Sequence, residues 1–230
     1  MAWLRFLTIV FGLALSFVVG CNSPLQVEVA IPPRRFGISG RVLPVPPELQ
    51  KESRIALLPC TVLPCPDLES WVLECVHEIC DPGPREIVLE SKDVIDLDLL
   101  LREEGAALRL IESAEITQAF YRTVTNSLNF SLAKIELFVG PESAAGLDAP
   151  GVARIGVIPP VLEMALGEGE VQIDHNGVQT LATQLAKGER RLRFFLRTFV
   201  DIRPGDPIPE GLWEIELRLK LRVSGRIKES

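Results

Sequence analysis

The chain has two histidines, His77 and His175, and this small number restricts the catalytic chemistry that it can support. His77 begins a run that starts like a zinc-protease helix, but Asp81 stands where the second histidine of H-E-x-x-H would be. We therefore interpret His77 as a surface residue. His175 precedes Asn176-Gly177, the pair most typical of a tight β-hairpin, so the turn accounts for a polar residue there. The sequence contains no Gly-x-Ser-x-Gly nucleophile motif, phosphate loop or dinucleotide fingerprint.

Paired carboxylates are the other candidate for chemistry. Residues 94–100 alternate acidic and aliphatic side chains, which predicts a strand with Asp96 and Asp98 on its outer face and Asp93 nearby. Two carboxylates about 7 Å apart along a strand suit glycoside hydrolysis or a calcium ion. The alternative is that they form the solvated side of a half-buried strand.

Four cysteines, Cys60, Cys65, Cys75 and Cys80, lie within 21 residues in the spacing C-x4-C-x9-C-x4-C. In an exported chain, an even and closely spaced set predicts two disulfides. Spacing alone leaves three pairings open, of which the nested one, 60–80 with 65–75, fits a hairpin-like excursion. A zinc site with four thiolate ligands is the alternative, which an oxidising compartment disfavours.

Basic residues concentrate toward the end of the chain. Residues 188–230 carry ten Lys or Arg against seven Asp or Glu. If the last two strands pair across the turn at 203–211, Arg193 lies near Arg222 and Arg197 near Arg218, with Phe195 on the same side. This face is our candidate for binding an anionic partner, such as a glycan carboxylate, a lipid phosphate or an acidic protein. Its cations are Arg191, Arg193, Arg197, Arg218, Lys220 and Arg222. The alternative is a solvated face balanced by Glu214, Glu216 and Asp201, with Phe195 and Phe199 covered by a neighbouring segment.

The last two strands also give the clearest information on fold. Residues 213–223 alternate strictly between apolar and charged side chains, and residues 192–202 do so nearly as well, which predicts strands with one buried face. Further strand patterns recur at 86–90, 108–116, 123–139, with a break near Ala133, and 153–158. Strands of this spacing with few helical windows predict an antiparallel β-sandwich. The end of the chain, with its Pro-x-Gly turn and Trp-x-Ile-x-Leu strand, resembles the final strands of immunoglobulin-like or jelly-roll modules.

Within the cysteine cluster, residues 67–79 fit either a short helix starting at Asp67 or a strand over 71–76, and we favour the helix. We expect a disulfide-rich, partly helical insertion over residues 59–84, named here the disulfide insertion.

The N-terminal 21 residues indicate where the cell directs the protein. Arg5 precedes an apolar run from Phe6 to Val19, which is too short to cross a bilayer as a helix and typical of an export signal. The run ends in Val18-Val19-Gly20-Cys21, which resembles the lipobox of bacterial lipoproteins. The resemblance implies cleavage before Cys21 and lipid on its sulfur and amine, and Asn22 favours the outer membrane in a Gram-negative cell. Residues 21–35, with three prolines, are then expected to form a tether, in which the alternation over residues 25–31 allows an edge strand.

Composition restricts the partners. The chain has a net charge of −7, and removal of residues 1–20, which contain Arg5 and no acid, leaves −8. An acidic chain lacks the clustered excess of cations that nonspecific nucleic-acid binding requires. The sequence therefore predicts a mainly β, lipid-anchored binding or structural module of a bacterial cell envelope. We expect a signal helix over 1–20 and a sandwich domain over 36–228, with no catalysis and no cofactor beyond the lipid. A carbohydrate-active enzyme and a subunit of an envelope assembly are the alternatives.

Overall fold

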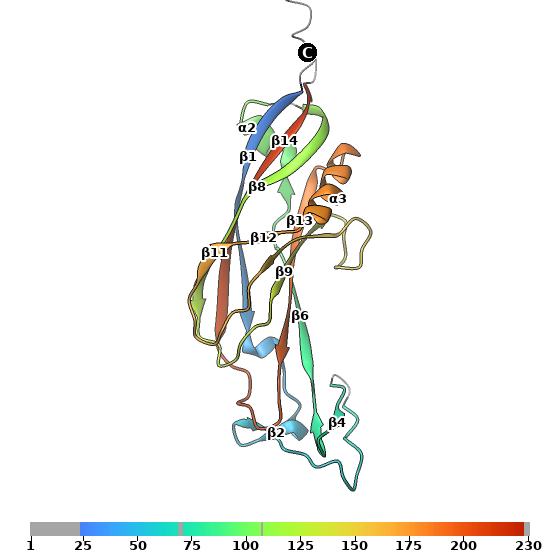
Figure 1. Ribbon diagram of the computed structural model, residues 1–230, viewed down its shortest axis with the longest axis vertical. Helices are drawn as coiled ribbons and strands as arrows, with labels where there is room; N and C mark the ends of the chain where they lie inside the picture. Colours follow the sequence, from blue (N-terminus) through green and yellow to red (C-terminus); the bar gives the residue numbers. More distant parts are fainter. Residues whose placement is uncertain (1–23, 69–70, 107, 228–230) are drawn as a thin grey trace, which may run out of the picture.

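The computed structural model describes residues 24–68, 71–106 and 108–227. It is an elongated antiparallel β-sandwich of two sheets (Figure 1), as the sequence predicts. The predicted signal helix, its lipobox and Cys21 lie outside the described residues.

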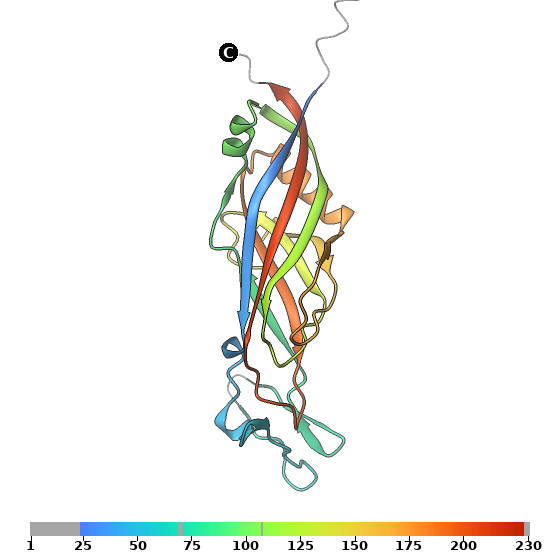
Figure 2. The same cartoon turned by 90° about the vertical axis from the view of Figure 1, so that its left-hand side faces the viewer.

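The first sheet has four strands in the order β1-β14-β8-β11. The three long strands β1, β14 and β8 run side by side along the molecule (Figure 2). Their bounds are Leu25–Ser39 (β1), Leu108–Asn126 (β8), Glu168–Glu170 (β11) and Leu212–Ile227 (β14).

The second sheet has the order β12-β10-β9-β13-β6, and β7 also pairs with β13. Its strands are Pro84–Glu90 (β6), Ile95–Asp96 (β7), Ile135–Pro141 (β9), Ala153–Ile158 (β10), Gln172–Ile173 (β12) and Arg191–Asp201 (β13). Two small hairpins lie apart from both sheets, one made of Gln50–Lys51 (β2) and Arg54–Ile55 (β3) and the other of Glu74–Val76 (β4) and Ile79–Asp81 (β5). Within the described ranges, the helices are two short 3-10 turns, Gly40–Val42 (η1) and Pro47–Leu49 (η2), and two α-helices, Leu97–Glu103 (α2) and His175–Ala186 (α3).

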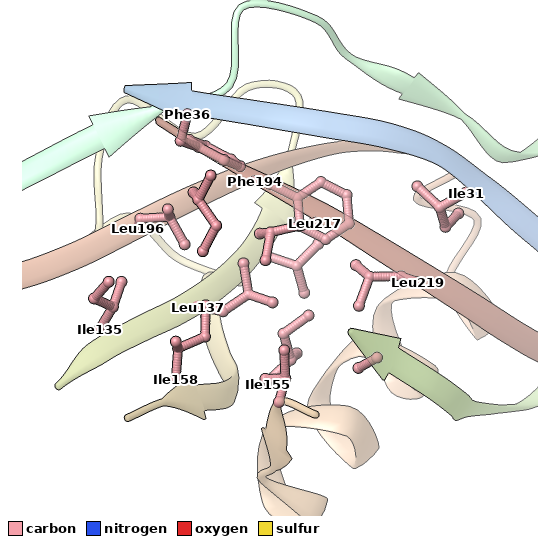
Figure 3. Packing of buried hydrophobic residues seen from close by; sticks show 14 of the residues in the cluster. Ile31, Phe36, Ile135, Leu137, Ile155, Ile158, Phe194, Leu196, Leu217 and Leu219 are labelled. Carbon is pink, nitrogen blue, oxygen red and sulfur yellow. The ribbon is translucent and has the colours of Figure 1, made fainter. Parts of the chain in front are cut away.

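The hydrophobic core fills the space between the two sheets (Figure 3). Alternate residues of β14, from Trp213 to Val223, are at most 4% exposed, and Leu192, Phe194 and Leu196 of β13 are equally buried. At about 25 cal/mol per Å² of apolar surface removed from water, this layer supplies the main stabilisation of the fold. The predicted buried faces of both strands are confirmed.

The last two strands do not pair with each other, which corrects the sequence interpretation. β13 is bonded to β9 and to β6 and β7, whereas β14 lies between β1 and β8 in the other sheet. The turn that follows β13 therefore crosses between the sheets. Both strands alternate because the two sheets face each other across one core, and alternation does not distinguish this arrangement from a hairpin.

Residues 25–35 form the first part of β1 at the edge of the first sheet, so the edge strand expected there is confirmed and this part of the chain is not a free tether. Val29 and Ile31 are at most 4% exposed in the core. The ladder to β14 shifts register between Ile31 and Arg34, so Pro32 and Pro33 lie in an irregularity at the sheet edge, where missing N–H donors are tolerated.

The strand predicted over 94–100 is reduced to β7, after which α2 begins, and the hairpin predicted at Asn176-Gly177 is instead the start of α3. Asp96 accepts a hydrogen bond from the Leu99 backbone N–H and caps α2, which buries Leu97 and Leu101 on one face. Asp174 likewise caps α3, so Asn176-Gly177 lies in the first helical turn and not in a hairpin. The long strand expected over 123–139 is interrupted between β8 and β9, and the break includes Ala133.

Candidate functional site: the disulfide insertion and two arginine-bound glutamates

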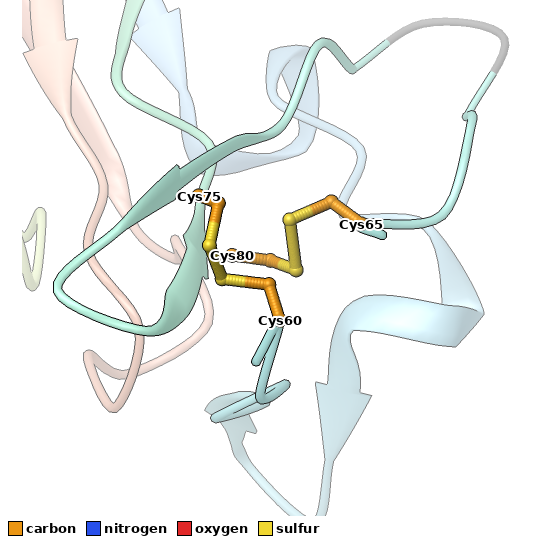
Figure 4. Close-up of a disulfide and its surroundings, with 4 residues drawn as sticks. All are labelled: Cys60, Cys65, Cys75 and Cys80. Carbon is orange, nitrogen blue, oxygen red and sulfur yellow. A yellow bond between two sulfur atoms is a disulfide. The ribbon is translucent and has the colours of Figure 1, made fainter. Parts of the chain in front are cut away.

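Two disulfides join the four clustered cysteines, Cys60 with Cys75 and Cys65 with Cys80 (Figure 4). The prediction of two disulfides is supported, but the nested pairing is wrong. Cys75 and Cys80 face each other across the β4–β5 hairpin, and each pairs with a cysteine of the preceding segment. Each bridge closes a segment with a sequence separation of 15.

Residues 67–79 are not helical where the structure describes them, which corrects the preference for a helix in the disulfide insertion. The hairpin turn at His77 and Glu78 has positive φ at both residues, 48° and 67°. The segment that ends at Cys60 pairs with this hairpin as a third extended segment. The Cys60 N–H donates to the Glu78 carbonyl, and the Cys80 N–H donates to the Leu58 carbonyl. In a β-hairpin, Cys75 and Cys80 can lie opposite each other on neighbouring strands. A helix would instead space cysteines along its axis.

Trp71 anchors the disulfide insertion to the rest of the molecule. Its ring is 3% exposed, its indole N–H donates to the Pro44 carbonyl at 3.1 Å, and the Arg85 guanidinium lies 4.8 Å from the ring centroid. The disulfide insertion is thus held by covalent bonds, backbone pairing and a buried aromatic side chain.

The sulfur atoms of Cys60, Cys65 and Cys80 lie within 4.8 Å of one another. This clustering is close to what four thiolates around a zinc ion require, since a Zn–S bond is about 2.3 Å long. In this structure all four sulfurs are in disulfides and offer no thiolate.

Aliphatic side chains on the disulfide insertion face solvent in spite of this bracing. Val62, Leu63 and Val72 are 89%, 72% and 76% exposed, and Val76 is 39% exposed. This exposed aliphatic surface was not predicted from the sequence. The run Thr61-Val62-Leu63, which lies between Cys60 and Pro64, could have indicated it, because aliphatic residues in so short a loop have little core to enter.

The predicted anion-binding face does not exist as one surface. Since β13 and β14 belong to facing sheets and their apolar residues point inward, their cations lie on opposite outer sides of the sandwich. Each cation has an acidic partner. On β13 the pairs are Arg191–Glu142 at 2.9 Å, Arg193–Glu90, and Arg197–Glu136 at 2.7 Å; on β14 they are Arg218–Glu216 at 2.7 Å, Lys220–Glu28 at 3.7 Å and Arg222–Glu115 at 3.3 Å. The alternative of a charge-balanced surface is closer to the structure, and Phe195, 1% exposed, is covered as that alternative predicts.

On each outer face, one glutamate with a carboxylate only 7% exposed collects three cations. Glu136 is approached by Arg154, Arg197 and Lys134 at 3.0, 2.7 and 3.6 Å. Burial by itself would raise the pKa of Glu136, but hydrogen bonds from Arg197 and Arg154 outweigh it and hold the pKa below the usual value.

The counterpart on the other face is Glu216, with Arg218, Arg35 and Arg122 at 2.7, 3.4 and 3.5 Å. The hydrogen bond from Arg218 is the largest influence and lowers the pKa of Glu216, against the opposing effect of burial. Sequence reasoning named Glu216 as a balancing acid but missed Glu136, Arg35, Arg122 and Arg154, because the cross-strand register was unknown.

The proposed carboxylate pair lies at the start of helix α2 and not on one face of a strand. Asp93 binds Arg34 at 3.1 Å, Asp96 caps α2, and Asp98 forms an ion pair with Arg190 at 3.8 Å. The glycosidase and calcium readings required these carboxylates on one strand face, and that geometry is absent for them. The described residues line two hollows, one of about 730 Å³ around Pro44 and Pro209 and one of about 600 Å³ between the edges of β1 and β6. The second is lined by Arg34, Arg35 and Lys92 together with Glu90, Asp93 and Glu214, a mixture of both charges.

Comparison of the chain with protein-family models, with curated proteins and with solved structures finds no match. Among the residues that the structure describes, no helix is both long enough and apolar enough to cross a bilayer.

Proposed function

We propose that the protein is a lipid-anchored binding or structural module of a bacterial cell envelope, attached through Cys21 and displaying the disulfide insertion away from the membrane. The observation that carries this proposal is that the start of β1 and the disulfide insertion lie at opposite ends of the long axis of the sandwich. β1 begins at Leu25, four residues after Cys21, and the start of β1 and the end of β14 lie at one end of the sandwich, since Leu25 pairs with Gly225. The disulfide insertion lies at the other end (Figure 1).

This arrangement supports an anchoring role for the first end. Four residues reach at most about 14 Å, so an acyl chain on Cys21 would hold the start of β1 close to the lipid headgroups. Two or more acyl chains suffice for stable attachment. The two disulfides fit an oxidising compartment outside the cytosol.

Replacement of Cys21 tests the proposal. Wild-type protein from a bacterium that processes lipoproteins is expected to lack residues 1–20, to carry added acyl mass and to partition into the Triton X-114 phase. Cys21→Ala is expected to remain in the aqueous phase. An intact mass that retains residues 1–20, or detergent partitioning of Cys21→Ala equal to wild type, contradicts the proposal.

A subunit of a larger envelope assembly is the second candidate function. The exposed aliphatic side chains of the disulfide insertion favour it, because soluble surfaces rarely expose several large apolar groups together without a partner.

A further inference from the structure

The disulfide insertion combines strong bracing with exposed apolar side chains. Two disulfides, backbone pairing at Cys60 and Cys80, and buried Trp71 fix this segment. Yet Val62, Leu63 and Val72 are more than 70% exposed and add nothing to the core. Fixing a loop in one conformation before binding lowers the entropic cost of association, which is the physical advantage of bracing a contact surface.

The charge of the disulfide insertion identifies the chemistry of the partner. Residues 59–84 contain five acids and no Lys or Arg. Of the four acids that the structure describes, Asp67, Glu74 and Glu78 are exposed and Asp81 is half-buried. Cations at the base of the disulfide insertion are engaged: Arg203 binds Asp201 at 2.5 Å and Arg54 donates to the Gly205 carbonyl at 2.8 Å.

We propose that the disulfide insertion docks onto a protein surface that has an apolar pocket with a rim of lysines and arginines. Val62 and Leu63, the most prominent aliphatic pair, enter the pocket, and Glu74 and Glu78 face the basic rim. This inference rests on the proposed function, which directs the disulfide insertion away from the membrane. The cationic rim speeds and orients the encounter, and burial of the aliphatic side chains adds affinity as their apolar surface leaves water.

A protein fits this surface better than a lipid bilayer or a glycan. Anionic headgroups repel a segment with five acids and no base. Sugar rings are usually held by exposed aromatic rings and polar groups, whereas Trp71, the one aromatic residue of the disulfide insertion, is buried against Pro44 and Arg85.

The test uses a defined probe, a random twelve-residue peptide library displayed on phage. The full purified chain is immobilised on beads through a C-terminal affinity tag, and beads without the protein remove background binders. Selected peptides are expected to be enriched in Lys and Arg beside aliphatic or aromatic residues. Their affinity should fall at least tenfold for Val62→Ser/Leu63→Ser and for Glu74→Lys/Glu78→Lys, and should fall as salt is raised.

Matched controls lie on the β11 side of the sandwich. Leu162 and Leu166 are 65% and 68% exposed, and Glu168 and Glu170 are exposed on β11. Leu162→Ser/Leu166→Ser and Glu168→Lys/Glu170→Lys should leave peptide affinity within twofold of wild type. Because all eight substitutions are at exposed positions, circular dichroism and disulfide mapping should show unchanged folding.

Three results overturn the proposal. The first is a selected pool with no excess of basic residues, the second is equal affinity of the peptides for the wild type and both variants of the disulfide insertion, and the third is binding to phosphatidylglycerol vesicles that depends on Val62 and Leu63. Peptide binding to the immobilised purified chain depends neither on lipid at Cys21 nor on where the cell places the chain. Failure of this test therefore leaves the Cys21 result standing, and failure at Cys21 leaves this test readable.

Discussion

At the scale of single residues, the outer faces of the sandwich are organised by Glu136 and Glu216. A carboxylate that is 7% exposed is costly to ionise unless charged partners surround it, and each of these two has three. The cations are themselves 32–68% exposed, so they remain solvated while the carboxylate bridges them. Each glutamate thereby links strands that lie far apart in the sequence.

Replacing Glu136 by Gln is expected to destabilise the protein. The amide keeps the shape but removes the charge that Arg154, Arg197 and Lys134 share, so we expect a loss of roughly 1–3 kcal/mol in the free energy of unfolding. Urea denaturation followed by circular dichroism measures it. Glu168→Gln, at an exposed position of β11, is the control and should change stability by less than about 0.5 kcal/mol. Equal stability of the two variants would show that the Glu136 cluster contributes nothing.

Acid should weaken the fold through the same groups. The hydrogen bond from Arg154 lowers the pKa of Asp174, and Glu136 and Glu216 also have lowered pKa values. A carboxylate whose pKa is lower in the folded than in the unfolded state contributes stability that is complete above its unfolded pKa and disappears as the pH falls through the folded pKa. The free energy of unfolding is therefore expected to be level above about pH 6 and to decline below about pH 4.5. Denaturation series between pH 2.5 and 7 check this, and the decline should be shallower in Glu136→Gln.

At the scale of elements, α3 depends on one glycine. Gly177 lies in the first turn of α3 against the backbone of β10, where an added Cβ would overlap the Arg154 carbonyl oxygen. The close approach lets Asp174 cap the helix while its carboxylate binds Arg154 at 2.8 Å. Glycine is needed here for contact between elements and not for a turn.

Gly177→Ala is expected to cost roughly 1–3 kcal/mol, because the helix must shift away from β10, although alanine favours helix formation by about 1 kcal/mol. Gly146→Ala is the control, since a Cβ at Gly146 meets nothing within 4 Å. Thermal unfolding of both variants measures the difference. A Gly177 variant as stable as the Gly146 variant would mean that α3 is not seated as closely on β10 as the structure has it.

These elements show what the sequence could and could not provide. Alternation identified the buried faces of β13 and β14 because it depends only on each strand. Their partners depend on how the sheets face each other, which local pattern does not encode. The hairpin prediction at Asn176-Gly177 was wrong because this pair occurs both in hairpin turns and at the start of a closely packed helix. Only the capping residue Asp174 distinguishes the two structures here. Glu136 could not be predicted as a cluster centre, because β9, Ile135–Pro141, is buried along its whole length and shows no alternation of buried and exposed residues.

At the scale of the whole molecule, the sandwich separates its two ends. β14 alone has 16 residues, which at about 3.3 Å per residue span roughly 50 Å. The hydrogen-bonded ladders of β14 to β1 and β8 make this length stiff, since they continue over most of it. A rigid spacer of this kind gives the disulfide insertion a fixed reach from any anchor at the start of β1.

The orientation that the proposed anchor at Cys21 implies can be measured with one dye position at each end. Leu110 is 41% exposed and pairs with Arg226 near the start of β1, whereas Val62 is 89% exposed in the disulfide insertion. An azide-bearing amino acid at either position accepts a dye without adding a cysteine that would disturb the disulfides. In bilayers with quencher on the lipid headgroups, we expect strong quenching at position 110 and little at position 62, because the quencher acts over a distance shorter than the long axis. The Cys21→Ala protein should show neither, and equal quenching at both positions would mean that the molecule lies flat on the membrane.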